Sequence, residues 1–287
     1  MQAALLSHVE YDTKWYTKSK FLDEVHRLSL ATKMRSQRNK YILSAGHLAP
    51  ALYAVLAQKE VFDELIEAQH FSGLDISEKR QEYLKTIRSI DGDLEGHPSL
   101  VHSPFVIDAS TGPLGQGAGT SVGYALNDSR SAGKSGSGLH TFALLGDGEC
   151  QEGQVWEAAM NAAKFKLANL TWVVDRNFIQ IDGDTESVGG LDLNHELSDE
   201  FSGLANKFKS FGWVVSENLD GNDYEKCNEA IEKSIEWQKE SGLPGVIINY
   251  TKVGYPFKQF GTYKWHGKTP TEAEAIKAAG ELKDETV

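Results

Sequence analysis

The sequence contains little cysteine, no excess of positive charge and no long hydrophobic segment. Its two cysteines, Cys150 and Cys227, show no paired spacing, which excludes a disulfide framework and favours a reducing compartment. The formal net charge of −12 argues against nucleic acid and anionic membranes as partners, because it would repel their phosphates. The apolar run near the N-terminus, residues 3–6, is too short for a signal peptide or a membrane span. We therefore expect a cytoplasmic protein.

The length and composition are those of an ordinary globular chain. The 287 residues suffice for one large α/β domain or two small ones, with 40% apolar and 24% charged residues. No repeat or low-complexity tract is evident, and the Ser- and Gly-rich stretch 129–138 predicts an exposed loop. We predict an N-terminal helical segment over residues 1–40, with a helix within 18–38, followed by one domain over 41–287.

Short apolar runs predict the strands of a parallel sheet. Residues 141–146, 170–175 and 245–251 show no polar alternation, and a weaker run surrounds 213–215. Such runs are typical of strands that are buried on both faces. A helical pattern over 154–167 joins the first two runs into a βαβ unit. The pattern predicts a doubly wound α/β fold, a mostly parallel sheet with helices on both faces. Further helices are predicted at 47–58, 77–89, 199–209, 223–240 and 271–282.

The stretch LLGDGECQEG, residues 144–153, follows the first run and places acids among glycines. These acids could cap a helix, bind a metal or serve in acid–base chemistry. Asp147 and Asn177 follow the ends of two successive predicted strands, and a right-handed crossover brings such ends to one edge of the sheet. Their oxygens suit Mg²⁺, or another divalent cation such as Ca²⁺ or Mn²⁺. Gly146 and Gly148 would let a phosphate approach the backbone N–H groups.

An Asp-Gly pair after a strand, taken alone, is most often only a turn. The pairing of Asp147 with Asn177 across the crossover is better evidence, and it favours a magnesium–diphosphate site.

Several sequence blocks resemble the transketolase family. GDGE at 146–149 and DRNFIQIDG at 175–183 resemble its thiamine diphosphate motif. Further blocks follow in the family's order: SAGHLAPALYAVLA with His47, EGHPSL with His97, STGPLGQG at 110–117 and KWHGKTP with His266. The match covers only the family's N-terminal, diphosphate-binding domain. The chain therefore resembles the N-terminal subunit of a split, two-chain transketolase.

The resemblance implies a cofactor, partners and roles for the matched residues. The cofactor would be thiamine diphosphate with a divalent metal bound by Asp147, Asn177 and the main-chain oxygen of Ile179. Cofactor-binding residues would be His47, Gly112, Pro113, Leu114, Gly148, Asn177 and His266, and catalytic residues His266, His97 and His47. Partners would be a C-terminal subunit with the pyrimidine-binding domain, a second copy of the chain and sugar phosphates. Such an assembly would be a heterotetramer, and its reaction would belong to pentose phosphate metabolism.

The other acids and histidines receive weaker assignments. Glu149 fits favourable electrostatics at a helix start, whereas the resemblance places Glu152 and Glu157 at a contact between active-site halves. Histidines outside the blocks are predicted to be ordinary surface residues, with the role of His102 left open: His8, His26, His70, His140 and His195.

The sequence departs from the family's pattern on the substrate side. The N-terminal Ser-Gly-His-Pro-Gly block is not found, which we interpret as truncation or as real divergence. The segment between Trp15 and Tyr41 is longer than the family's usual link, and Phe178 stands where glycine is usual.

Alternatives to a split transketolase therefore stay open. They are a transketolase-like enzyme acting on a sulfonated or branched sugar, a 1-deoxyxylulose-phosphate synthase, a 2-oxoacid dehydrogenase, and a non-catalytic cofactor-binding or interaction subunit.

Overall fold

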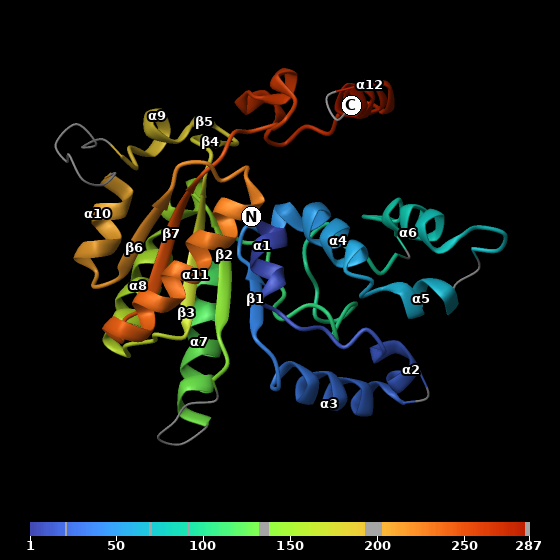
Figure 1. Cartoon of the computed structure of the whole chain (residues 1–287), viewed down its shortest axis with the longest axis horizontal. Coiled ribbons are helices and arrows are strands. Elements are labelled where there is room, and N and C mark those ends of the chain that lie inside the picture. Colours follow the sequence, from blue (N-terminus) through green and yellow to red (C-terminus); the bar gives the residue numbers. More distant parts are fainter. Residues whose placement is uncertain (21, 69–70, 91, 132–137, 193–202, 285–287) are drawn as a thin grey trace.

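A parallel sheet forms the centre of the chain. The computed structural model describes residues 1–20, 22–68, 71–90, 92–131, 138–192 and 203–284. The sheet has five strands in the order β1-β2-β3-β7-β6, all parallel (Figure 1). These strands are β1 Lys40–Leu43, β2 Thr141–Gly146, β3 Leu170–Arg176, β6 Val214–Asn218 and β7 Gly245–Tyr250. A small antiparallel pair, β4 Ile179–Gln180 and β5 Gly183–Asp184, follows β3. The predicted parallel sheet is confirmed.

Helices cover both faces of the sheet, because alternate strand residues point to opposite sides. In β2, Phe142 and Leu144 belong to one hydrophobic core, whereas Ala143 and Leu145 belong to the other. The first core includes α1 Gln2–Ser7, α4 Ala49–Gln58 and α11 Tyr224–Ser241. The second includes α7 Gln116–Ser131, α8 Gly153–Lys164 and α10 Gly203–Ser210. The doubly wound α/β architecture is therefore confirmed.

The remaining helices lie outside this central layer. In Figure 1, α2, α3, α5 and α6 lie beyond β1, and α12 lies beyond the end of the sheet where β4 and β5 are found. Their bounds are α2 Trp15–Ser19, α3 Glu24–Arg35, α5 Asp63–Ala68, α6 Ile76–Leu84, α9 Thr185–Gly189 and α12 Glu272–Asp284. Short 3₁₀ turns are η1 Gly46–Leu48, η3 Gly148–Gln151, η5 Lys258–Phe260 and η6 Tyr263–Trp265. No helix among the described residues is both long enough and apolar enough to cross a membrane.

Several element boundaries differ from the sequence prediction. The single helix predicted within 18–38 is two helices, because the Asp23 side chain caps the start of α3 by accepting from the His26 N–H. The helix predicted over 77–89 ends at Leu84, and Arg88 takes a left-handed conformation with φ of 64°. Residues 129–131 continue α7 rather than forming a loop. Residues 132–137 and 199–202 of the predicted loop and helix lie outside the described residues.

Strand β1 was not predicted, because it is short and begins with a charged residue. The Lys40 side chain is only 2% exposed, and its Nζ lies 2.7 Å from Asp128 Oδ2. The ion pair compensates for burial of the lysine charge. Asp108 similarly anchors β1, since its Oδ2 accepts from the Tyr41 N–H at 2.9 Å and it pairs with Arg38.

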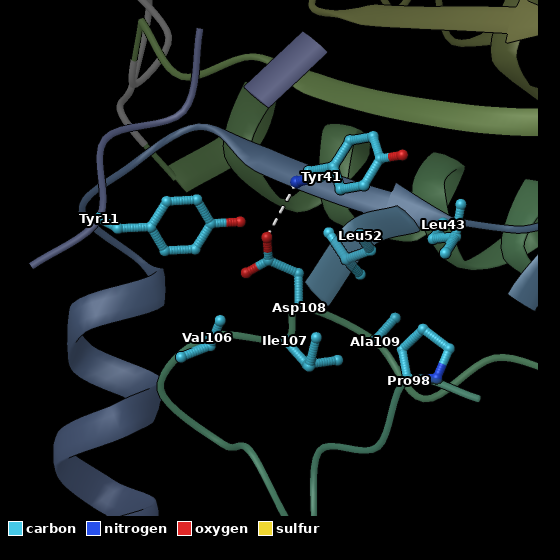
Figure 2. Close-up of a pocket in the computed structure, with 9 residues that line it drawn as sticks. All are labelled: Tyr11, Tyr41, Leu43, Leu52, Pro98, Val106, Ile107, Asp108 and Ala109. Atoms are coloured by element: carbon cyan, nitrogen blue, oxygen red, sulfur yellow. Dashed lines mark hydrogen bonds between the residues drawn. The ribbon is translucent and has the colours of Figure 1, made fainter. Parts of the chain in front are cut away.

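A small cavity lies beside this anchor of β1. Figure 2 shows Asp108 between the Tyr11 and Tyr41 side chains, with apolar residues closing the space below. The cavity volume is about 10 Å³, which suits about one water molecule and excludes a cofactor. The cavity therefore belongs to the packing of β1 and not to a ligand site.

Candidate functional site at the carboxyl edge of the sheet

The adjacent strands β2 and β3 bring Asp147 and the loop after β3 together. Gly146 of β2 lies opposite Asp175 of β3, and the Asp147 N–H donates to the Asp175 carbonyl oxygen at 3.2 Å. The Phe178 N–H, directly after Asn177, donates to Asp147 Oδ2 at 2.7 Å. The Asn177 side-chain oxygen accepts from the Ile179 N–H at 2.9 Å. The crossover thus places Asp147, Asn177 and Ile179 at one edge, as the strand pattern predicts.

The Asp147 carboxylate is buried, and both of its oxygens accept hydrogen bonds. Its Oδ2 also accepts from Arg176 Nη1 at 2.9 Å, and its Oδ1 accepts from the Gly148 N–H at 2.8 Å. Burial raises the pKa of Asp147 to about 6, while Arg176 opposes this shift. The carboxylate is therefore ionised at neutral pH and can attract a cation.

Arg176 is a buried cation that the sequence analysis did not single out. Its Nη1 donates to Thr185 Oγ1 at 2.7 Å, its Nη2 donates to Asp192 Oδ2 at 3.0 Å, and it also pairs with Glu186. The guanidinium links Asp147 to the start of α9 and to the residues after it. A lone basic residue at the end of an apolar strand, between Asp175 and Asn177, is the local signal that could have revealed it.

The histidines of the separate sequence blocks meet at the same edge. The ring centroids of His47 and His266 are 5.4 Å apart. The His97 ring packs against Gly46 and Gly112. A Cβ atom added to Gly46 would lie 3.1 Å from Cδ2 of His97, and one added to Gly112 would lie 3.5 Å from it. The structure therefore brings together the histidines of three blocks and the glycine of a fourth.

The surroundings of His47 and His266 favour the neutral form of each ring. Partial burial lowers the pKa of His47, and the nearby His266 and His97 lower it further. Burial also lowers the pKa of His266, although the Asp175 carboxylate opposes that shift. Neutral imidazoles can accept a proton at one nitrogen and donate from the other, which suits proton transfer at neutral pH.

The STGPLGQG segment crosses this edge between β1 and α8. The Thr111 hydroxyl donates to the Leu43 carbonyl oxygen at 2.6 Å, and Gln154 Nε2 donates to the Leu114 carbonyl oxygen at 2.6 Å. Gly115 has φ of +82°, and a Cβ there would lie 2.7 Å from Cγ of Gln154. Both the positive φ and the close approach of Gln154 favour glycine at this position. Gly112 is partly buried, whereas Pro113 and Leu114 lie at the surface.

Comparisons with known proteins agree with this geometry. Residues 24–282 match the family described as "Transketolase, thiamine diphosphate binding domain". The chain belongs to the transketolase family. It is 35% identical over 251 residues to an apulose-4-phosphate transketolase subunit of Actinobacillus succinogenes, covering 87% of this chain and 77% of that subunit. It is 34% identical over 250 residues to a transketolase of Streptococcus pyogenes, covering 85% of this chain but 30% of that protein.

Solved structures show the same relationship. A transketolase from Pichia stipitis superposes with a TM-score of 0.67 at 26% identity, covering 95% of this chain and 35% of that one. A transketolase from Campylobacter jejuni gives a TM-score of 0.67 at 27% identity, covering 96% of this chain and 37% of that one. The chain thus spans about a third of these longer transketolases but most of the apulose-4-phosphate transketolase subunits that it matches.

The chemistry of the residues at this edge is compatible with a diphosphate and a divalent metal, and the matched family domain is described as binding thiamine diphosphate. Asp147 and Asn177 offer hard oxygen ligands. Gln180 Nε2 is buried and has no hydrogen-bond partner within the described part of the chain. The Gln180 side chain packs against Gly148, where an added Cβ would lie 2.8 Å from its Oε1. The buried Gln180 amide lies beside Gly148 and has an N–H donor without an acceptor, so it could donate to an anionic ligand there.

Other predicted positions turn out differently. Glu149 lies in the first turn of η3, where helix-start electrostatics favour an acid, but it is also only 2% exposed and accepts three hydrogen bonds, which the sequence did not predict. His140 is partly buried rather than fully exposed; its Nε2 lies 2.8 Å from Thr171 Oγ1, and burial lowers its pKa to about 3. His102 pairs with Glu95 at 2.9 Å. Glu152 and Glu157 are exposed around the start of α8, and their contact with a second active-site half stays a prediction.

Proposed function

We propose that this chain is the N-terminal subunit of a thiamine-diphosphate-dependent transketolase. The complete enzyme transfers a two-carbon ketol unit from a ketose phosphate to an aldose phosphate. A separate C-terminal subunit supplies the pyrimidine-binding domain and the catalytic glutamate. The convergence of Asp147, the loop after β3 and the block histidines at one edge of the sheet carries this proposal. The high coverage of relatives that are themselves transketolase subunits, against about a third of longer transketolases, supports the split arrangement.

The proposed metal and diphosphate ligands come from two strand ends. Asp147, Asn177 and the main-chain oxygen of Ile179 would hold Mg²⁺ or a similar divalent cation, and Gly148 and Asn177 would contact the diphosphate. The bound cofactor supplies a carbanion nucleophile and an electron sink for cleavage of the ketose. Arg176 keeps the Asp147 carboxylate ionised and oriented, because it donates to Oδ2 and leaves Oδ1 on the Gly148 side.

The proposed proton transfers fall to the histidines. His47 and His266 lie close together and are held neutral, so either can take up or release a proton near the cofactor. His97 lies beside Gly112 and would face the substrate hydroxyls. Gly112, Pro113 and Leu114 would line the cofactor pocket between these histidines and α8.

Calorimetry on the full chain assembled with its partner subunit tests the cofactor site, because the partner supplies the pyrimidine-binding domain. Thiamine diphosphate is titrated with Mg²⁺ or with chelator into wild type, Asp147→Asn, Asp147→Ala and Glu240→Ala. Loss of a direct carboxylate ligand lowers the Mg²⁺-dependent affinity for thiamine diphosphate in both Asp147 variants by at least the roughly 10–100-fold that loss of an outer-shell partner costs. Glu240 is exposed at the end of α11, which leads into the opposite edge of the sheet, so Glu240→Ala binds like wild type. Equal affinity of Asp147→Asn and wild type, with and without chelator, would refute the metal assignment.

A second candidate concerns the substrate of the same reaction. Two of the transketolase-subunit relatives, 35% and 30% identical, are named for apulose 4-phosphate. We propose this sugar phosphate as the first alternative donor, and a panel of ketose phosphates with the assembled pair distinguishes it from a common pentose phosphate. A folded, cofactor-loaded pair that transfers nothing from any donor would favour a non-catalytic subunit.

A further inference from the structure

One buried carboxylate connects three parts of the chain at the carboxyl edge. Glu149 lies in η3, directly after Gly148, and is 2% exposed. Its Oε1 accepts from the Ser44 hydroxyl and from the Gly115 N–H, the latter at 2.6 Å. Its Oε2 accepts from the Gly146 N–H at 3.1 Å. The side chain therefore joins the end of β1, the STGPLGQG segment and the end of β2.

This arrangement exceeds what a helix-start acid requires. Burial raises the pKa of Glu149, while the donors from Ser44, Gly115 and Gly146 oppose that shift. A buried carboxylate is costly unless donors surround it, and here two of the donors come from parts of the chain distant in sequence. Favourable helix electrostatics would be served equally by an exposed acid. The long-range partners thus point to a different role.

The three connected segments surround the proposed cofactor pocket. Gly115 directly follows Leu114, and Gly146 directly precedes Asp147. Close packing reinforces the same junction, because a Cβ on Gly117 would lie 2.4 Å from Ser44 Oγ. Hydrogen bonds of Glu149 and close packing at Gly117 therefore both lie between segment 112–114 and the Asp147–Gly148 turn.

We propose that Glu149 is a positioning residue that preorganises the cofactor pocket. It fixes segment 112–114 against the Asp147–Gly148 turn before the cofactor arrives, and it touches neither cofactor nor substrate itself. Because this role rests on the proposed function, its test combines a cofactor-binding measurement with one that needs no cofactor.

The experiment compares the full-length wild type with Glu149→Gln, Ser44→Ala, the double variant and Glu240→Gln. In Glu149→Gln the carboxamide offers a single acceptor oxygen, and its NH₂ faces an N–H donor. In calorimetry with Mg²⁺ and thiamine diphosphate, each chain is assembled with the partner subunit and measured well below its melting temperature. Glu149→Gln then binds the cofactor about tenfold more weakly than wild type, as for loss of a hydrogen bond to a charged group. Ser44→Ala has a smaller effect and adds little to Glu149→Gln, because both act through one contact. Glu240→Gln is unchanged.

Amide hydrogen exchange without cofactor gives the independent readout. Glu149→Gln and Ser44→Ala accelerate exchange in peptides covering 110–117 and 146–148, whereas Glu240→Gln does not. A lower melting temperature with unchanged affinity and unchanged exchange in these peptides would overturn the proposal and leave Glu149 with a purely structural role. If the wild type assembled with its partner subunit fails to bind thiamine diphosphate, the proposed function falls, and hydrogen exchange still decides the role of Glu149. If Glu149→Gln fails to fold, Ser44→Ala carries both readouts.

Discussion

Replacing Phe178 with glycine sets backbone strain against side-chain contacts. Phe178 has φ of +65°, a left-handed conformation that costs an L-residue about 1–2 kcal/mol. Glycine removes this strain but raises the entropy of the unfolded chain, which costs about 1 kcal/mol in return. The two backbone effects nearly cancel, so the side chain decides the result.

The Phe178 ring makes contacts that glycine would lose. It lies 4.0 Å from the guanidinium of buried Arg176, and its centroid is 5.9 Å from that of Tyr250. A cation–π contact to a desolvated arginine contributes about 1–2 kcal/mol. Partial burial of the ring, which is 38% exposed, adds about 1 kcal/mol. We therefore expect Phe178→Gly to lower the free energy of unfolding by about 2 kcal/mol.

Urea unfolding of the isolated chain measures this difference, and Phe178→Leu serves as the matched variant. Leucine keeps the backbone strain and most of the apolar volume but loses the cation–π contact, so it lowers stability by about 1 kcal/mol. A Phe178→Gly chain that is more stable than wild type would refute the reasoning. It would show that strain outweighs the ring contacts and that phenylalanine is retained here for another reason.

Two further predictions concern the helix glycines and the buried histidine. Gly117→Ala destabilises the chain by about 1–3 kcal/mol, because the new methyl group would lie 2.6 Å from the Ser44 backbone. Gly119 has open space around it, so Gly119→Ala stabilises α7 by about 0.5–1 kcal/mol. Equal effects of the two substitutions on thermal unfolding would contradict this prediction. The folded-state pKa of His140, about 3, lies below its ordinary 6.5, so the unfolded chain binds the proton first and stability falls as the pH drops below about 6.5. At pH 5 the loss is about 2 kcal/mol, and unfolding curves of His140→Gln should lack this component of the pH dependence.

The sequence pattern predicted the strands correctly where a strand is buried on both faces. The runs that became β2, β3 and β7 are buried on both faces, so their continuous apolar character identified them. β1 was missed because Lys40 is neutralised by Asp128, a contact across a sequence separation of 88 residues. β6 lies at an edge of the sheet, and its polar residues hid all but its first part.

The site residues likewise fall into those that a sequence pattern predicted and those that depend on long-range contacts. Asp147 and Asn177 were found because each follows a strand end and the crossover rule relates the two ends. Glu149 was assigned from its immediate neighbours, whereas its partners Ser44 and Gly115 lie 105 and 34 residues away. Arg176 contacts Asp147 across 29 residues and α9 across nine. Such long-range polar contacts have no local signature, so only the folded structure could reveal them.

Ketol transfer by the isolated and the assembled chain tests the central claim most directly. The full-length chain is loaded with Mg²⁺ and thiamine diphosphate and assayed for transfer from a ketose phosphate to an aldose phosphate, alone and with increasing amounts of a partner that carries the pyrimidine-binding domain. We expect no turnover by the chain alone, because in the proposed function the catalytic glutamate belongs to the partner. Activity should rise with added partner and saturate at a fixed ratio. Turnover by the chain alone, or no transfer by a folded and cofactor-loaded pair, would contradict the account.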